Sequence, residues 1–158
     1  MEKSRSADPG DVASGDAVVK AFYEAVSFLP GRQPDYDRLR TLFHPEARVI
    51  PPEGELGPLL EVYGVEAFVS RSREHVVISG LERGGFSQTE IARRSHAFGS
   101  ILHVFSTYAA QPSATGEEAI QHGINSIQLL NEGGRWWVVT LHWEVERPGN
   151  PLPSRFLS

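Results

Sequence analysis

The sequence of 158 residues contains no cysteine, which excludes a disulfide framework, a thiol nucleophile and a cysteine-ligated metal. It also lacks an apolar run long enough to span a bilayer, and its first residues lack the apolar core of a secretory signal. No dense cluster of Lys or Arg is available to neutralise phosphates, and the formal net charge is −5. We therefore expect a cytoplasmic protein that binds neither nucleic acid nor membranes.

The apolar content is sufficient for one core, since 40% of the residues are hydrophobic. Residues 1–14 are small and polar and contain a Pro-Gly pair, which predicts a disordered leader. Residues 15–147 are the expected domain. Residues 148–158 contain three prolines and are expected to form an extended Pro-rich arm.

The first half of the domain has the periodicity of helices. Apolar residues at helical spacing predict a helix that Asp16 caps and that ends before Pro30. A second helix is expected over residues 35–43, and a third over residues 65–79. Between them, residues 48–50 read as a short strand stopped by a Pro-Pro pair.

The second half has the pattern of strands. Four long strands are expected, over residues 86–97, 100–110, 119–130 and 135–146. The last two are joined by the Gly-containing turn Asn131–Gly134, which is a strong hairpin signal. Helices followed by a meander of antiparallel strands predict an α+β fold in which helices pack on one face of a curved sheet.

Three local stretches, in this order of elements, resemble the nuclear transport factor 2-like (NTF2-like) superfamily. They are LFHPEARV at residues 42–49, YGVEA at residues 63–67 and GRWWVV at residues 134–139. The resemblance covers residues 16–146. The superfamily includes ketosteroid isomerases, SnoaL-like polyketide cyclases, scytalone dehydratase and limonene epoxide hydrolase. It implies a cone-shaped, strongly curved antiparallel sheet packed against three N-terminal helices, with any pocket at the open end of the cone.

The positions that match the catalytic residues of ketosteroid isomerases hold other side chains here. The general-base Asp of that family falls at Pro51, its oxyanion-hole Tyr at Phe22 beside Tyr23, and its protonated Asp at Ser126. These departures remove the proton donors and acceptors that steroid enolisation needs. Ketosteroid isomerase activity is therefore not expected.

Other residues of the strands are candidates for chemistry. If Ser126 faces into the cone, alternation along the strand places His122, Ile124 and Gln128 on the same face. His122 is then the predicted general base, with Tyr108 and Ser126 polarising or orienting the substrate. The alternatives are that His122 is solvated at the rim of the sheet and that Tyr108 is an ordinary core residue.

The predicted pocket is mostly apolar with a few polar groups, which is typical of small-molecule sites. Its predicted lining is Phe22, Tyr23, Val49, Pro51, Phe68, Ile124, Gln128, Val139, Leu141 and Trp143. The interpretation is a lyase or isomerase without cofactor, which acts on a small hydrophobic carbonyl compound by general acid–base chemistry. The alternative is a non-catalytic domain for binding a hydrophobic ligand or for dimeric association.

Two further expectations concern metals and partners. Four histidines come from separate strands, but the sequence has neither a His-x-His pair nor a His-Glu-x-x-His motif, so no metal site is expected. The second face of the sheet is predicted to be apolar and to pair two copies in a symmetric homodimer. The residues of that predicted patch are Trp136, Val138, Thr140, His142, Ile127 and Leu129.

Overall fold

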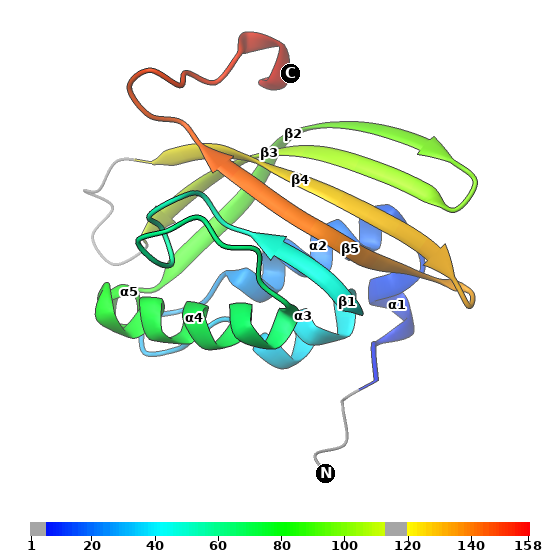
Figure 1. Cartoon of the computed structure of the whole chain (residues 1–158), viewed down its shortest axis with the longest axis horizontal. Coiled ribbons are helices and arrows are strands. Elements are labelled where there is room, and N and C mark those ends of the chain that lie inside the picture. Colours follow the sequence, from blue (N-terminus) through cyan, green and yellow to red (C-terminus); the bar gives the residue numbers. More distant parts are fainter. Residues whose placement is uncertain (1–5, 113–119) are drawn as a thin grey trace.

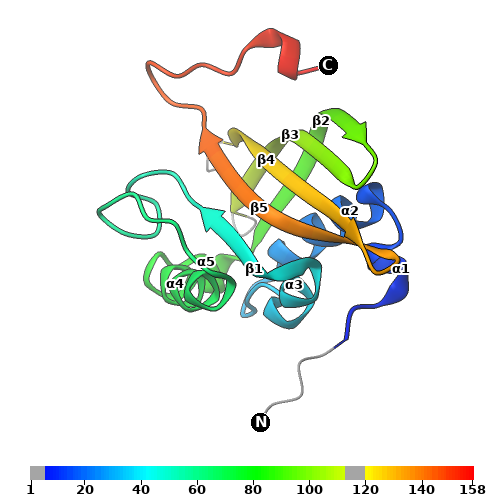
Figure 2. The same cartoon turned by 45° about the vertical axis from the view of Figure 1, so that its right-hand side comes forward.

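The computed structural model of the protein describes residues 6–112 and 120–158. Its five-stranded sheet, in the order β1-β5-β4-β3-β2, curves around helices that lie against one face (Figures 1 and 2). The strands are β1 (Phe43–Ile50), β2 (Phe86–Phe98), β3 (Ile101–Pro112), β4 (Gln121–Glu132) and β5 (Arg135–Val145). The helices are α1 (Pro9–Val12), α2 (Gly15–Val26), α3 (Tyr36–Leu42), α4 (Val65–Ile78), α5 (Leu81–Gly84) and the 3-10 turn η1 (Ser154–Phe156). The predicted α+β class and curved sheet are confirmed.

The sheet is antiparallel except at one edge. β2 to β5 form a meander in which each strand pairs antiparallel with the next. β1 pairs parallel with β5, a pairing that the predicted antiparallel meander does not include. Because β1 reaches the meander through α4 and not through a hairpin, no tight turn forces it to run antiparallel. The β4–β5 turn has positive φ at Gly133 (63°) and Gly134 (79°), as a two-residue hairpin turn of this kind requires.

The predicted helices form where the apolar period indicated them, with one change of cap. Ser14, not Asp16, caps α2, because its Oγ accepts a hydrogen bond from the Ala17 N–H at 3.0 Å. Asp16 instead forms an ion pair with Arg93 on β2. None of the described helices is both long and apolar enough to cross a membrane.

Part of the predicted leader is folded. Asp8 caps α1 by accepting from the Gly10 N–H at 2.9 Å, and Val12 is buried in the core. Asp11 holds this turn to α3 through an ion pair with Arg38 at 2.9 Å. The prediction of disorder is therefore wrong from residue 8 onward, because one apolar residue and one ion pair dock the turn. Residues 1–5 lie outside the described part of the chain.

The C-terminal arm returns to the sheet. Its Pro-rich part is extended as predicted, but η1 lies against the face of the sheet turned away from the helices, here called the outer face. The Thr107 hydroxyl donates to the Phe156 carbonyl at 2.6 Å, and Arg94 Nη2 donates to the Arg155 carbonyl at 2.7 Å. The rings of Phe105 and Phe156 are 5.0 Å apart. The arm thus covers part of the outer face.

The core lies between the helices and the opposite, inner face of the sheet. Its fully buried members include Val18, Val19, Leu39, Leu42, Val49, Val104, Ile127, Val138 and Leu141. Four of the six residues predicted for the dimerisation patch are therefore not on the outer face: Ile127, Leu129 and Val138 are buried in this core, and Trp136 packs against it. Pairing of two copies stays a prediction, without that patch to support it.

Candidate functional site

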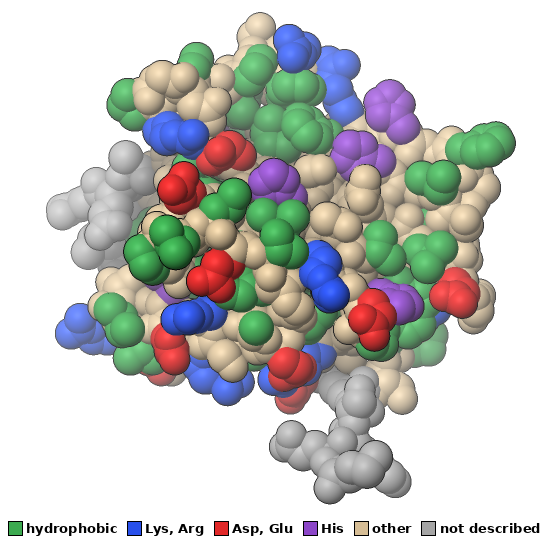
Figure 3. Space-filling model, viewed as in Figure 1, with side chains coloured by type: hydrophobic (Ala, Val, Ile, Leu, Met, Phe, Trp, Pro, Cys, Tyr) green, Lys and Arg blue, Asp and Glu red, His purple; other side chains and the backbone are tan. Residues whose placement is uncertain are grey.

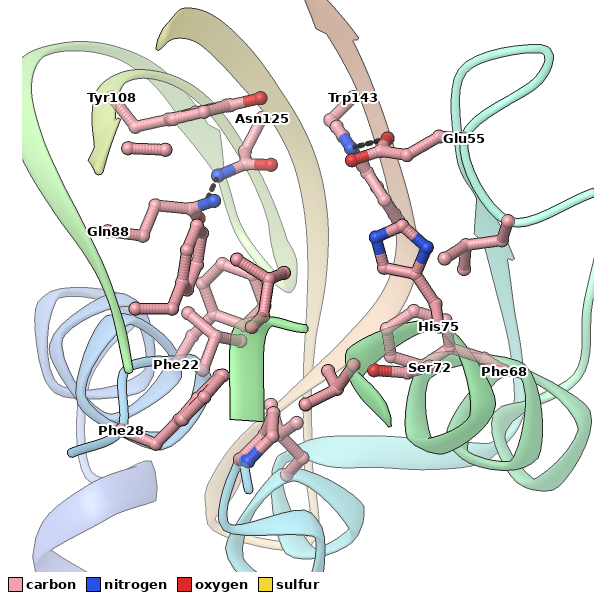
Figure 4. A pocket seen from close by; sticks show the side chains of 18 of the residues that line it. Phe22, Phe28, Glu55, Phe68, Ser72, His75, Gln88, Tyr108, Asn125 and Trp143 are labelled. Carbon is pink, nitrogen blue, oxygen red and sulfur yellow. Dashed lines mark hydrogen bonds between the residues drawn. The ribbon is translucent and has the colours of Figure 1, made fainter. Parts of the chain in front are cut away.

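A cavity of about 410 Å³ opens between the inner face of the sheet and α4 (Figure 4). Aromatic rings make up much of its wall, and Glu55 is the one carboxylate among the described lining residues, which include no Lys or Arg. Such a site favours a molecule that is largely apolar and carries no negative charge. The aromatic lining residues are Phe22, Phe28, Phe68, Phe86, Tyr108 and Trp143.

α4 presents one face to the cavity. Phe68, Ser72 and His75 are four and three residues apart, so they lie on one side of the helix, and all three line the cavity. Burial lowers the pKa of His75, which favours the neutral imidazole that can accept a proton. Arg71 and Arg73 are close neighbours of His75 in the sequence. Those two are exposed, whereas His75 is not.

Glu55, in the loop after β1, lies on the same side of the cavity as His75 (Figure 4). Its Oε2 accepts a hydrogen bond from Trp143 Nε1 at 2.8 Å. Desolvation by the surrounding wall raises the pKa of Glu55. The hydrogen bond from Trp143 lowers this pKa, and the negative charge of Glu144 raises it further. A carboxylate and an imidazole, the usual groups for proton transfer, thus share one wall.

The opposite wall, on the sheet, carries a buried hydrogen-bonded network. Asn125, on β4, donates through Nδ2 to the Tyr23 hydroxyl at 3.1 Å and to Gln88 Oε1 at 3.3 Å. The Tyr23 hydroxyl lies 2.6 Å from Ser106 Oγ, and Ser106 in turn donates to Glu90. Ser106 and Asn125 are 0% and 2% exposed, so these polar groups are paired within the core.

Tyr108, on β3, lines the cavity beside this network. It is buried, and burial raises the pKa of its hydroxyl well above the usual range, so the hydroxyl keeps its proton. Gly123, opposite it on β4, leaves the space for its ring: a Cβ at position 123 would lie 2.4 Å from the Tyr108 hydroxyl oxygen. Tyr108 can therefore donate a hydrogen bond to a ligand, as predicted for a pocket hydroxyl.

The structure brings together four of the ten predicted lining residues. Phe22, Phe68, Leu141 and Trp143 line the cavity together with Tyr108. Other predicted lining residues are buried but are not among those that line it. Tyr23 lies behind Asn125, Val49 on β1 is part of the core, and Pro51 is buried directly after β1.

The remaining predictions on β4 are wrong about the face of the strand. The inner-face residues of β4 are Gly123, Asn125, Ile127 and Leu129, which alternation separates from the four predicted ones. Ile124 and Ser126 instead line a second hollow of about 270 Å³ beneath the C-terminal arm. Of the other two, Gln128 is exposed, and His122 lies at the rim with its Nδ1 3.8 Å from Glu146.

A bulge changes the alternation of β5. Gln128 pairs with Thr140 and Leu129 pairs with Val138, which leaves Val139 as an extra residue. Leu141 and Trp143 therefore face inward as predicted, but Val139 is not part of the cavity wall.

Histidines on the outer face do not form a ligand cluster. His96 pairs with His103 across β2 and β3, and the His103 Nε2 lies 3.0 Å from Ser126 Oγ, which pairs with His142. Figure 3 shows histidine side chains spread over the strands. Within residues 6–112 and 120–158, no three His, Cys, Asp or Glu side chains are grouped to hold a metal ion.

Sequence reasoning missed six polar residues of the cavity: Glu55, Ser72, His75, Gln88, Gln121 and Asn125. A signal existed for His75, since Phe68, Ser72 and His75 share a helix face. Asn125 becomes visible only if the face of β4 is assigned correctly. No local pattern distinguishes Glu55 from other residues of its Gly- and Pro-rich loop.

Comparison with models of protein families and with curated proteins found no match. Solved structures do match. An NTF2-like protein of unknown function from Silicibacter pomeroyi DSS-3 is 13% identical, with a TM-score of 0.54 over 83% of this chain and 92% of that one. A protein provisionally named a ketosteroid isomerase, from Shewanella frigidimarina NCIMB 400, is 19% identical, with a TM-score of 0.58 over 85% and 96% of the two chains.

A third structure, provisionally named a scytalone dehydratase and from Novosphingobium aromaticivorans DSM 12444, is 16% identical. Its TM-score is 0.51 over 71% of each chain. At these identities the likeness concerns the fold alone, because this fold carries many unrelated activities. The chain therefore has the fold of the NTF2-like proteins, as the sequence predicted.

Proposed function

We propose that this protein binds a small, neutral and largely apolar carbonyl compound in the cavity and acts on it as a lyase or isomerase by general acid–base catalysis. One observation carries the proposal: an apolar cavity of about 410 Å³ has proton-transfer groups on one wall and hydrogen-bonding groups on the other. Structural neighbours provisionally named as an isomerase and a dehydratase agree with this reaction class.

In this proposal His75 removes a proton from the carbon next to the substrate carbonyl. Its lowered pKa supplies the neutral imidazole needed at neutral pH. Tyr108, whose side chain is buried, donates a hydrogen bond from its hydroxyl to the carbonyl oxygen, where negative charge develops. Glu55, on the same wall as His75, stabilises the imidazolium that forms.

The test is proton exchange on 1-indanone, a neutral ketone small enough for the cavity. The protein in deuterium oxide is expected to accelerate deuteration next to the carbonyl, followed by proton NMR. His75→Gln should lower the rate to the level without protein. The matched control His122→Gln changes a histidine at the rim and should leave the rate unchanged. Equal loss in both variants would contradict the role of His75.

Binding without catalysis is the second candidate. Pro51 stands where the related isomerases have their general base, and it is buried outside the cavity wall. Binding of 1-indanone, measured by calorimetry, with no accelerated deuteration would favour this alternative. Absence of both binding and exchange of 1-indanone would contradict the proposed carbonyl chemistry in either form.

A further inference from the structure

The buried network on the sheet wall begins at an ion pair. The β2–β3 ladder skips a residue at Ile91, and this bulge places Glu90 and Arg93 on the same face of β2. Arg93 Nη2 donates to Glu90 Oε1 at 2.8 Å, and its Nε lies 3.1 Å from both carboxylate oxygens. Glu90 is therefore held as a carboxylate, which can only accept hydrogen bonds.

Which group donates in the hydrogen bonds of Ser106 and Tyr23 follows from the one hydrogen that each hydroxyl carries. Ser106 has one hydroxyl hydrogen and donates it to Glu90. Tyr23, whose hydroxyl oxygen is 2.6 Å from Ser106 Oγ, must then be the donor to Ser106. Its own oxygen is left as an acceptor. The network thus runs in one direction, from the cavity toward Glu90.

This direction fixes the amide of Asn125. Only its nitrogen can face the Tyr23 oxygen at 3.1 Å, since an amide oxygen there would oppose a second acceptor. The same nitrogen donates to Gln88 Oε1 at 3.3 Å, so both amide hydrogens are used. No described residue donates a hydrogen bond to Asn125 Oδ1. Every fully buried side-chain nitrogen or oxygen of the described residues has a hydrogen-bond partner, so an oxygen without one is not fully buried. Asn125 Oδ1 is therefore open to the cavity. Figure 4 shows it turned toward the opposite wall.

We propose that Glu90, Ser106 and Tyr23 are positioning residues that hold Asn125 as a hydrogen-bond acceptor, so that the cavity selects a neutral ligand carrying a hydroxyl or N–H group. The inference rests on the proposed function and narrows its substrate class. The carbonyl of the substrate meets Tyr108, the donor on this wall, while a hydroxyl or N–H of the same molecule meets Asn125. Ethers and ketones without such a hydrogen leave Asn125 Oδ1 unpaired.

The test compares 2-naphthol with 2-methoxynaphthalene, two probes of similar shape that differ in one donor hydrogen. Calorimetry should show that the wild-type protein binds 2-naphthol about tenfold more tightly, which is the effect of about 1.4 kcal/mol. In Glu90→Gln the new amide can donate a hydrogen bond to Ser106. The donor and acceptor in each hydrogen bond of the network can then exchange roles, and the side-chain amide of Asn125 can rotate. The preference should then fall to about twofold or less. The matched control Glu66→Gln removes a surface carboxylate that also pairs with an arginine, Arg40, and should keep the tenfold preference.

Ser106→Ala is a second variant that breaks the network without changing a charge, and it should also abolish the preference. Equal binding of both probes by the wild-type protein would overturn the inference while leaving the proposed cavity intact. If neither probe binds, binding and exchange of 1-indanone still decide the proposed function, and NMR decides the inference separately. The side-chain amide hydrogens of Asn125 should exchange slowly with water when they face Tyr23 and Gln88. Rapid exchange would overturn the inference.

Discussion

Substitution of Gly123 by alanine tests which face of β4 forms the cavity wall. A Cβ at this position would lie 2.4 Å from the Tyr108 hydroxyl oxygen, 2.5 Å from its Cζ and 2.6 Å from the backbone oxygen of Glu144. These distances are well inside ordinary contact. The tyrosine could rotate into the cavity, but the backbone oxygen belongs to the neighbouring strand β5 and cannot move without distorting the sheet.

Overpacking of this kind typically costs about 1–3 kcal/mol. For a chain of this length, each kcal/mol lowers the melting temperature by about 2–4 °C, so Gly123→Ala should lower it by about 2–12 °C. Scanning calorimetry and urea unfolding provide the measurement. Gly57→Ala is the control, because a Cβ there meets its nearest atom at an ordinary 3.6 Å. If Gly123→Ala were as stable as the wild-type protein, residue 123 would face outward and Asn125 could not line the cavity.

Three further substitutions test other parts of the structure. Burial raises the pKa of Tyr23 from 10.0 to about 12, so the unfolded chain loses this proton first. The free energy of unfolding should fall between about pH 10 and 12, by about 3 kcal/mol in total, because each pH unit between the two pKa values is worth about 1.4 kcal/mol. Tyr23→Phe should flatten that fall in urea unfolding. Ser14→Ala removes the cap of α2 and should cost about 1 kcal/mol in the same measurement. Phe156→Ala removes the ring contact with Phe105 and should cost about 1 kcal/mol and increase binding of a hydrophobic dye; no change in either would mean that the arm is not held to the sheet.

The positions of the helices and strands were predictable because each rests on a local period. α4 was expected over residues 65–79 and spans Val65–Ile78, and β5 was expected over residues 135–146 and spans Arg135–Val145. The parallel pairing of β1 was not predictable in the same way. It depends on a contact between residues far apart in the chain, which no local pattern encodes.

The faces of the strands were the main error. β4 carries apolar residues on both sides, since Ile124 and Ile127 differ in parity, so burial cannot be assigned from alternation alone. Ile124 is covered by the C-terminal arm, which the sequence indicated only as an extended segment. The match of Ser126 to an inward-facing position of the ketosteroid isomerases then selected the wrong side, because Asn125, Ile127 and Leu129 are the buried residues of this strand.

The polar groups in this core restrict the arrangement of their side chains more than apolar groups would. Burial removes the hydrogen bonds with water from Asn125, Tyr23 and Ser106. The free energy gained from their mutual hydrogen bonds only about balances the free energy lost in this way. Such networks contribute little net stability when complete, but they tolerate few alternative arrangements because each unpaired member is costly. The ion pair of Glu90 and Arg93 removes the remaining choice of direction. A charge near the surface therefore determines which atom a residue inside the cavity presents to a ligand.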